Sequence, residues 1–170
     1  LGLDMFQRLD VEKDEIGDHV LSPRMHAKLA PHHSKPCVLG KEAQIARGGH
    51  FSKFEKLNSP KELYLLHLKY VDFGEYVHAM NSRNAIVQEI GVGVTETSIG
   101  RHWFAEARGE DREVFDGFAS YKMEEGFNLD WVRDEMRESW KPRGETGFWQ
   151  FDRPDYQTQV RLPDRFARLF

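Results

Sequence analysis

The clearest hydrophobic pattern is the run of apolar side chains over residues 63–68, which carries one imidazole, His67, near its end. The side chains on both alternating faces of this run are apolar, and His67 shares its face with Leu63 and Leu65. Side chains of a strand alternate between the two faces of a sheet. A run that is apolar on both faces is typical of a central strand covered on both sides. The pattern therefore predicts a buried strand here.

Two shorter strands are predicted before this run. Residues 37–39 are apolar and follow a proline, and residues 42–47 alternate in polarity, so together they fit a hairpin. Gly48 and Gly49 then interrupt regular structure, because glycine readily adopts positive φ angles. His50 follows in the predicted loop. We expect a small sheet region around residues 37–71.

The hydrophobic period changes from two to 3.6 after Asp72, which predicts helices. Asp72 and Glu75 are spaced as a capping box, with the aspartate as the cap. Further helices are predicted within 110–121 and over 129–140, the latter capped by Asn128. Three apolar stripes support these helices: Phe73, Tyr76, Val77, Met80 and Val87; Val114, Phe115, Phe118 and Tyr121; Leu129, Val132, Met136 and Trp140.

The segment 1–34 carries weaker signals. Positions 3–9 fit either one helical turn or, at 5–6, a short strand, and positions 24–29 fit one short turn. His32 and His33 read as an exposed loop. Adjacent side chains point apart in an extended chain, so this pair is not expected to bind one ion together.

At 170 residues the chain is expected to form a single domain, or a fragment of a longer protein because it begins without methionine. Residues 1–71 form a loop- and strand-rich part, and residues 72–170 a helical part that ends in an aromatic tail. The predicted fold class is α/β or α+β, with the small sheet followed by a helical C-terminal half.

Composition narrows the classes of function. The net charge of −4 argues against a nucleic-acid-binding protein, which usually carries a basic surplus. No run approaches the roughly 18 apolar residues of a transmembrane helix. A single cysteine, Cys37, excludes an internal disulfide framework, so a reducing, cytoplasmic setting is expected. Cys37 itself is interpreted as a buried structural thiol.

Eight histidines make metal binding a possibility to weigh. His67 fits either a core histidine bonded to backbone or a ligand near a strand end, since neutral imidazole binds first-row divalent cations. His50 fits either an exposed loop residue or a ligand that the two preceding glycines allow to approach closely. The wide sequence spacing between His50 and His67 matches no compact metal motif. The Gly91–Val92–Gly93 segment lacks the third glycine of a dinucleotide fingerprint.

Three segments resemble the C-terminal part of bacterial family-2-like glycosyltransferases. They are Lys35-Pro36-Cys37-Val38; Gly48-Gly49-His50; and Leu63-Tyr64-Leu65-Leu66-His67-Leu68-Lys69-Tyr70-Val71-Asp72. In that family a Lys-Pro strand leads to a Gly-x-His turn, followed by a Leu-Tyr-Leu-x-His-Leu-Lys/Arg-Tyr strand and an amphipathic helix. The late Leu162-Pro163-Asp164-Arg165-Phe166 is similar to a motif near the ends of such chains. The resemblance covers roughly residues 20–90 and this tail.

This resemblance implies a partial GT-A-like domain of an enzyme that transfers a sugar from a nucleotide-sugar donor to a sugar or glycan acceptor. It also implies Mn²⁺ or Mg²⁺, with His67 as the first candidate ligand and His50 as the second. Lys69, Arg83 and His50 are the candidate substrate-binding residues. The metal would neutralise the departing nucleoside diphosphate.

The chain departs from the family pattern in one respect. It contains no Asp-x-Asp motif, and Asp10-Val11-Glu12 resembles such a motif only loosely. The resemblance therefore implies a nucleotide-binding half before Leu1, without which this piece would be inactive. The alternative is a non-catalytic binding or interaction module. In that module exposed Trp103, Trp131, Trp140 and Trp149 would contact a partner or a carbohydrate, unless they pack in the core.

Overall fold

The computed structural model describes residues 1–12, 24–36, 42, 44–46, 49–90 and 111–167. Within these residues the fold is mixed α/β, built on a five-stranded sheet in the order β3-β1-β2-β7-β4. The strands are β1 (Gly2–Phe6), β2 (His26–Leu29), β3 (Leu65–Tyr70), β4 (Lys122–Met123) and β7 (Thr158–Arg161). A separate two-stranded sheet pairs β5 (Lys141–Pro142) with β6 (Trp149–Gln150).

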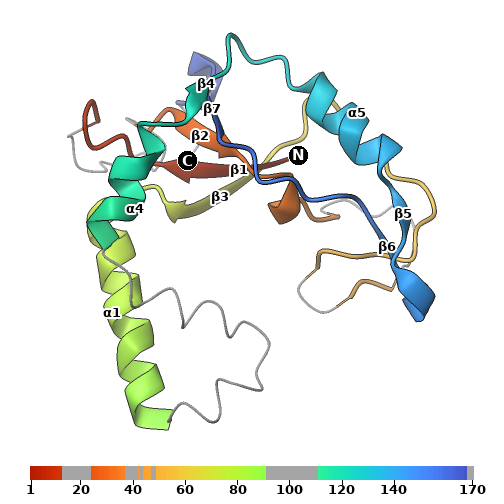
Figure 1. The fold of residues 1–170 in the computed structure, drawn as a ribbon, viewed down its shortest axis with the longest axis horizontal. Coiled ribbons are helices and arrows are strands. Elements are labelled where there is room, and N and C mark those ends of the chain that lie inside the picture. Colours follow the sequence, from red (N-terminus) through yellow and green to blue (C-terminus); the bar gives the residue numbers. More distant parts are fainter. Residues whose placement is uncertain (13–23, 37–41, 43, 47–48, 91–110, 168–170) are drawn as a thin grey trace.

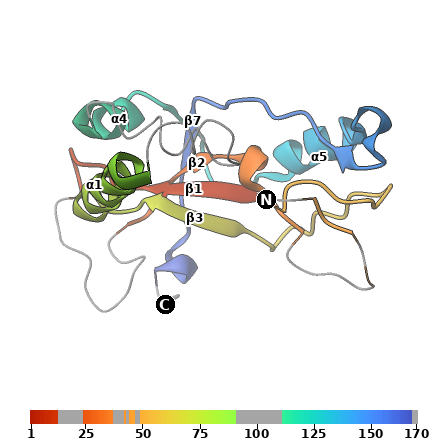
Figure 2. The same cartoon turned by 90° about the horizontal axis from the view of Figure 1, so that it is seen from below.

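Three α-helices lie among the described residues: α1 (Phe73–Ile90), α4 (Asp111–Phe118) and α5 (Asp130–Glu138). Short 3₁₀ turns are η1 (Pro31–His33), η3 (Gly144–Thr146) and η4 (Asp164–Phe166). In both views α1 and α4 lie at one end of the large sheet, and α5 lies at the other end (Figures 1 and 2). None of the described helices combines the length and the apolar character that a membrane crossing requires.

The sheet is centred on the N-terminal strand. All five residues of β1 are buried, and β1 pairs antiparallel with β2 and parallel with β3. Strand β2 pairs in turn with β7 from the C-terminal tail, so the two ends of the chain meet in one sheet. Burial of β1 follows from its sequence, because its small and apolar residues suit a strand covered on both faces.

The helices close two hydrophobic clusters. One packs Val132 and Met136 of α5, and the preceding Leu129, against β1, β2 and β7. The other joins Phe6 to α1 and α4, mainly through aromatic rings. Among these, Phe115 contacts the rings of Tyr70, Phe73, Tyr76 and Phe118.

The helix predictions are confirmed at α1, α4 and α5, with boundaries shifted by a few residues. Asp72 caps α1, since its Oδ1 accepts a hydrogen bond from the Glu75 amide at 3.0 Å. The N-cap residue of α5 is Leu129 rather than the predicted Asn128, although Asn128 Oδ1 accepts a hydrogen bond from the Asp130 amide at 3.2 Å. Val114 departs from its predicted stripe, because it is exposed on α4. Cys37, the 91–93 segment and Trp103 lie outside the described residues.

Several strand predictions were wrong. The expected central strand is β3, which starts at Leu65 and lies at an edge of the sheet. The sheet draws mostly on segments outside 37–71, because β1, β2 and β7 supply its interior. Positions 24–29 contribute to β2 rather than to a turn. Most of the hairpin expected between residues 37–39 and 42–47 lies outside the described residues, and Ile45 instead forms an isolated bridge with Ser52.

Candidate metal centre

The register between β1 and β3 places Asp4 directly beside His67. Asp4 Oδ1 lies 3.2 Å from His67 Nδ1. Asp4 is almost completely buried, although its neighbours along β1, Leu3 and Met5, are apolar core residues. A charge in such a strand is costly unless it is paired. The pairing across strands therefore explains how the carboxylate is tolerated.

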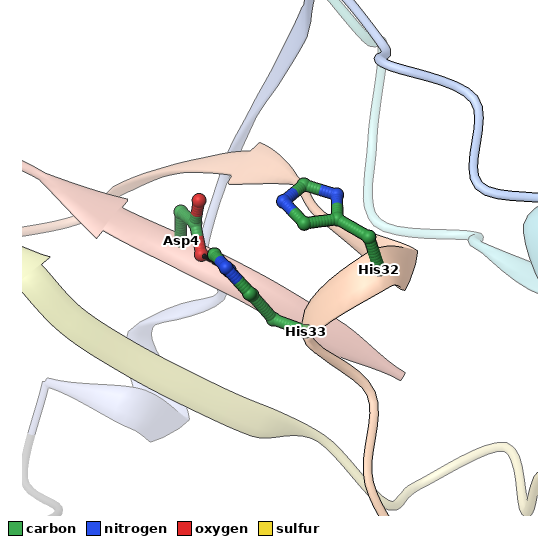
Figure 3. Close-up of side chains that lie close together, drawn as sticks. All are labelled: Asp4, His32 and His33. Atoms are coloured by element: carbon green, nitrogen blue, oxygen red, sulfur yellow. Dashed lines mark hydrogen bonds and ion pairs between the residues drawn. The ribbon is translucent and has the colours of Figure 1, made fainter. Parts of the chain in front are cut away.

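The turn η1 adds two more imidazoles beside the same carboxylate. His33 Nδ1 donates a hydrogen bond to Asp4 Oδ1 at 2.5 Å, and the ring centroids of His33 and His67 are 4.4 Å apart. His32 lies beside His33, with 4.1 Å between ring centroids. One ligand atom from each of Asp4, His32 and His33 falls within 4.8 Å of the others. Figure 3 shows the two histidines reaching from η1 toward the carboxylate on β1.

The position of η1 depends on a close approach of two backbones. Gly2 on β1 accepts a bond from the Ala30 amide at 3.2 Å and donates its own amide to Ser34 Oγ at 2.8 Å. A Cβ atom at Gly2 would lie only 2.5 Å from the Ala30 carbonyl oxygen. Only glycine fits there without displacing the turn. Gly2 thus holds the His32–His33 turn over Asp4.

Electrostatics favour the ligand-ready forms of these groups. Burial opposes ionisation of Asp4, but contacts with His33 and His67 outweigh it and hold the pKa of Asp4 at about 2. Burial, and then the neighbouring charge of His33, lower the pKa of His32 to about 4. At neutral pH the site therefore offers a carboxylate and a neutral imidazole, which are the forms that bind metal ions.

His67 Nδ1 gives a further indication of a ligand. It is buried and has no partner of hydrogen-bonding geometry among the described residues, although the His67 side chain is 40% exposed. A buried polar atom without such a partner is uncommon and requires an explanation. This atom lies 3.2 Å from Asp4 Oδ1, so a cation placed between the two groups would contact both.

The donor set favours some divalent ions over others. One carboxylate with two or three imidazoles suits Mn²⁺, Zn²⁺ or Fe²⁺, whereas Mg²⁺ prefers oxygen ligands and octahedral geometry. The residues present fit a first-row divalent ion, and they fit Mn²⁺ better than Mg²⁺.

The sequence-predicted candidates fall in different places. His67 lies next to this cluster, 3.2 Å from Asp4, but outside the group of metal-capable atoms formed by Asp4, His32 and His33. Lys69 follows His67 by two residues on β3, beyond an irregularity in the register with β1. His50 is outside the group of metal-capable atoms and instead lines a neighbouring cavity. Arg83 is on α1, where its Nη1 contacts Met80 Sδ at 3.9 Å, and it does not meet the cluster.

Sequence reasoning did not select Asp4, His32 or His33 as candidate ligands, and the expected exposed loop at His32 and His33 was wrong. A 3₁₀ turn, rather than an extended chain, places the two rings side by side. The available signal was Asp4 itself, a lone carboxylate in an apolar run. The Asp10-Val11-Glu12 segment, which was compared with an Asp-x-Asp motif, has a structural role instead. Asp10 pairs with Arg8, and Glu12 pairs with His26.

The tryptophans considered for a binding surface are largely engaged with other aromatic rings. Trp140 stacks with Trp149 and Phe151, and its indole nitrogen donates to the Phe54 carbonyl at 3.2 Å. Trp131 is 36% exposed and meets Tyr156 edge-on. Comparison with protein-family models, curated proteins and solved structures finds no match for this chain.

Proposed function

We propose that this chain is the C-terminal region of a metal-dependent glycosyltransferase that uses a nucleotide-sugar donor. Asp4, His32 and His33 hold the divalent ion, and His67, with its Nδ1 3.2 Å from Asp4 Oδ1, is the fourth candidate ligand. The observation that carries the proposal is the cluster of Asp4, His32 and His33, together with the contact of Asp4 with His67 on β3, the strand with the family-like motif. A cytoplasmic setting is part of the proposal, because nucleotide sugars are intracellular donors and the chain has one cysteine.

Each residue of the candidate metal centre has a separate role in this proposal. Asp4 supplies negative charge from a rigid, fully paired strand, which fixes the position of the site. His33 and His67 supply nitrogen donors from two different elements, η1 and β3. When bound, the ion would neutralise the negative charge that develops on the departing nucleoside diphosphate. Lys69, two residues after His67 on β3, would add positive charge toward that group.

The order of elements supports a role at the edge of a larger site. β3 is an edge strand among the described residues, and His67 has its ring partly open to solvent. A sugar acceptor and a donor could therefore approach the cluster from the side of β3. The proposal requires a nucleotide-binding half that is not contained in these residues, in keeping with the lack of an Asp-x-Asp motif.

The test compares binding of uridine diphosphate to the chain with Mn²⁺ and with EDTA, followed by transfer assays on the full gene product. We expect Mn²⁺ to strengthen nucleotide binding, and His67→Ala to abolish that gain and to reduce metal-dependent transfer by at least about 100-fold. His78→Ala is the matched control, because His78 is exposed on α1. Normal metal-dependent transfer by the His67→Ala enzyme would refute the assignment.

A further inference from the structure

A cavity of about 490 Å³ is lined by α5, by residues between 50 and 63, and by the segment that follows η1. It is distinct from the candidate metal centre, because Asp4, His32 and His33 are not among its lining residues. Six large apolar side chains line it: Phe54, Leu57, Leu63, Met136, Trp140 and Phe151. Since one water molecule takes up about 30 Å³ of liquid, the cavity has room for roughly fifteen non-hydrogen atoms. Apolar walls around such a volume are typical of a small-molecule site.

The loop 54–63, which forms one side of the cavity, is held by hydrogen bonds from α5 and the segment after it. Three side chains donate to its backbone carbonyls: Arg133 to Pro60 at 3.1 Å, Arg137 to Ser59 at 2.8 Å and Trp140 to Phe54 at 3.2 Å. Positions 133, 137 and 140 have the spacing of one helix face. Arg133 is fully buried, and burying a guanidinium is costly unless it is hydrogen-bonded. The wall is therefore preformed, which lowers the ordering cost of binding a ligand.

The ionisable side chains around the cavity give it a positive character. Lys35, Lys56 and His50 line it, whereas no aspartate or glutamate does within the described ranges. In the same part of the chain no carboxylate lies within ion-pair distance of Lys56. Burial, and then the charges of Lys35 and Arg153, lower the pKa of His50. In a chain of net charge −4, this local excess of positive charge favours an anionic ligand.

The available donors suit a carboxylate better than a phosphate group. Phosphate sites typically combine guanidinium forks with the backbone N–H groups of a helix N-terminus. No arginine lines the cavity in the described part of the chain, and α5 reaches it through Met136, in its last turn. A carboxylate needs fewer donors, and ammonium and hydroxyl groups provide them. Ser34 Oγ accepts the Gly2 amide at 2.8 Å, so its hydroxyl hydrogen remains available to donate.

We propose that this cavity binds a monocarboxylic acid with an apolar body, either a medium-chain fatty acid or an aromatic acid. The ammonium groups of Lys35 and Lys56 pair with the carboxylate, and the apolar body lies against Trp140 and Phe151. The site requires neither a metal ion nor a nucleotide, and it goes beyond the metal-dependent transfer proposed above.

The test is calorimetric titration of the chain in EDTA with octanoate, hexanoate, 3-phenylpropanoate and octylamine. We expect one octanoate per chain, bound at least about tenfold more tightly than octylamine, because the two carry opposite charges. Hexanoate should bind about fifteenfold more weakly than octanoate, since each buried CH₂ contributes about fourfold. Tighter binding of octanoate assigns a fatty acid, and tighter binding of 3-phenylpropanoate assigns an aromatic acid.

A pair of double variants tests the charges. Lys35→Gln/Lys56→Gln should raise the octanoate dissociation constant by at least about tenfold. Lys53→Gln/Lys61→Gln is the matched control, because it removes the same charge from two lysines that do not line the cavity. Octylamine binding as tightly as octanoate, or equal losses in the two double variants, would overturn the proposal. Absence of both octanoate and 3-phenylpropanoate binding by the wild type would also overturn it.

Two further variants test the cavity itself and its independence from the metal centre. Leu63 lines the cavity and is 39% exposed, so Leu63→Trp should narrow the cavity without unfolding the chain. We expect at least about tenfold weaker octanoate binding, with urea unfolding near that of the wild type. Octanoate binding unaffected by Leu63→Trp would place the ligand elsewhere. Asp4→Asn should bind octanoate in EDTA as the wild type does, whereas failure of the metal-site proposal would appear as Mn²⁺ binding that is indifferent to Asp4→Asn.

Discussion

Asp4 on β1 and His67 on β3 stand opposite each other across a parallel strand pair, with 3.2 Å between Oδ1 and Nδ1. Side chains of a strand alternate between faces, so a shift of one residue in this register would turn His67 away from Asp4. Two backbone hydrogen bonds next to β1 fix the register between β1 and β3. The Leu1 backbone nitrogen donates to the Leu63 carbonyl at 3.0 Å, and the Leu65 amide donates to the Leu1 carbonyl at 2.9 Å.

A first prediction concerns Gly2. Gly2→Ala should push η1 away from β1, because the new Cβ would meet backbone atoms of Ala30 and Ser34 at 2.5 and 2.8 Å. We expect a loss of about 2 kcal/mol or more in the free energy of unfolding and a weaker Mn²⁺ affinity. Urea unfolding and Mn²⁺ titration measure the two effects.

Gly117→Ala is the matched control for this change. Gly117 lies in α4, and no other atom lies within 4 Å of the position that an alanine Cβ would take there. Alanine favours the helix over glycine by about 0.5 to 1 kcal/mol, so this variant should be neutral or slightly more stable. Equal destabilisation by both substitutions would contradict the role given to Gly2.

A second prediction concerns pH. Because the pKa of His32 falls from 6.5 to about 4 on folding, the unfolded chain binds more protons at His32 between these values. Stability should therefore rise with pH from about 4 to 6.5 and be lost as pH falls through this window. His32 is partly exposed, so we expect a contribution of about 1 to 2 kcal/mol.

Urea unfolding of the wild type and His32→Gln across pH 4 to 7 measures this contribution. The variant should show a flatter dependence, because glutamine does not titrate. His78→Gln, at an exposed position on α1, should retain the wild-type slope. Parallel curves for the wild type and His32→Gln would show that the His32 pKa is not depressed by folding.

A third prediction concerns the buried charge of Arg24. Its side chain is fully buried, with Nη2 3.0 Å from Asp72 Oδ2 and Nε donating to the Val71 carbonyl at 2.8 Å. Asp72→Asn keeps a capping oxygen for α1 but removes the counter-charge, so we expect a loss of about 3 kcal/mol in unfolding free energy. Asp72→Ala should lose about 1 kcal/mol more, because the cap is also removed.

The double variant Arg24→Met/Asp72→Asn isolates the ion pair. Methionine fills similar volume without a charge, so the double variant should be more stable than Asp72→Asn alone. Chemical denaturation of the wild type, both single variants and the double variant completes the cycle. An Asp72→Asn protein as stable as the wild type would mean that the pair contributes nothing.

The sequence predicted the helices better than the sheet, for a local reason. A helix cap such as Asp72 and an apolar stripe such as Tyr76 and Met80 lie within one segment of the sequence, so both can be recognised from that segment alone. The partners of a strand cannot be recognised in this way, because β1 pairs with β3 and β2 pairs with the C-terminal β7, each across a long stretch of intervening chain. The alternation in 63–68 therefore identified a strand, but gave no indication that it forms an edge.

The candidate site was only partly predictable for the same reason. His67 was identified because a histidine stands out in an apolar run. Asp4 stands out in the same way, but the segment around it fitted a helical turn as well as a strand. The pair His32 and His33 was misjudged because the chain bends into a 3₁₀ turn there. That turn is held in place by Gly2, which is distant from it in the sequence.

The most direct test of the metal centre is a Mn²⁺ titration without nucleotide, followed by electron paramagnetic resonance of the free ion. We predict one ion per wild-type chain, and an Asp4→Asn dissociation constant raised by at least about 100-fold, because a ligand is lost. His78→Ala should match the wild type. Equal Mn²⁺ affinity in the wild type and Asp4→Asn would contradict the assignment of this site.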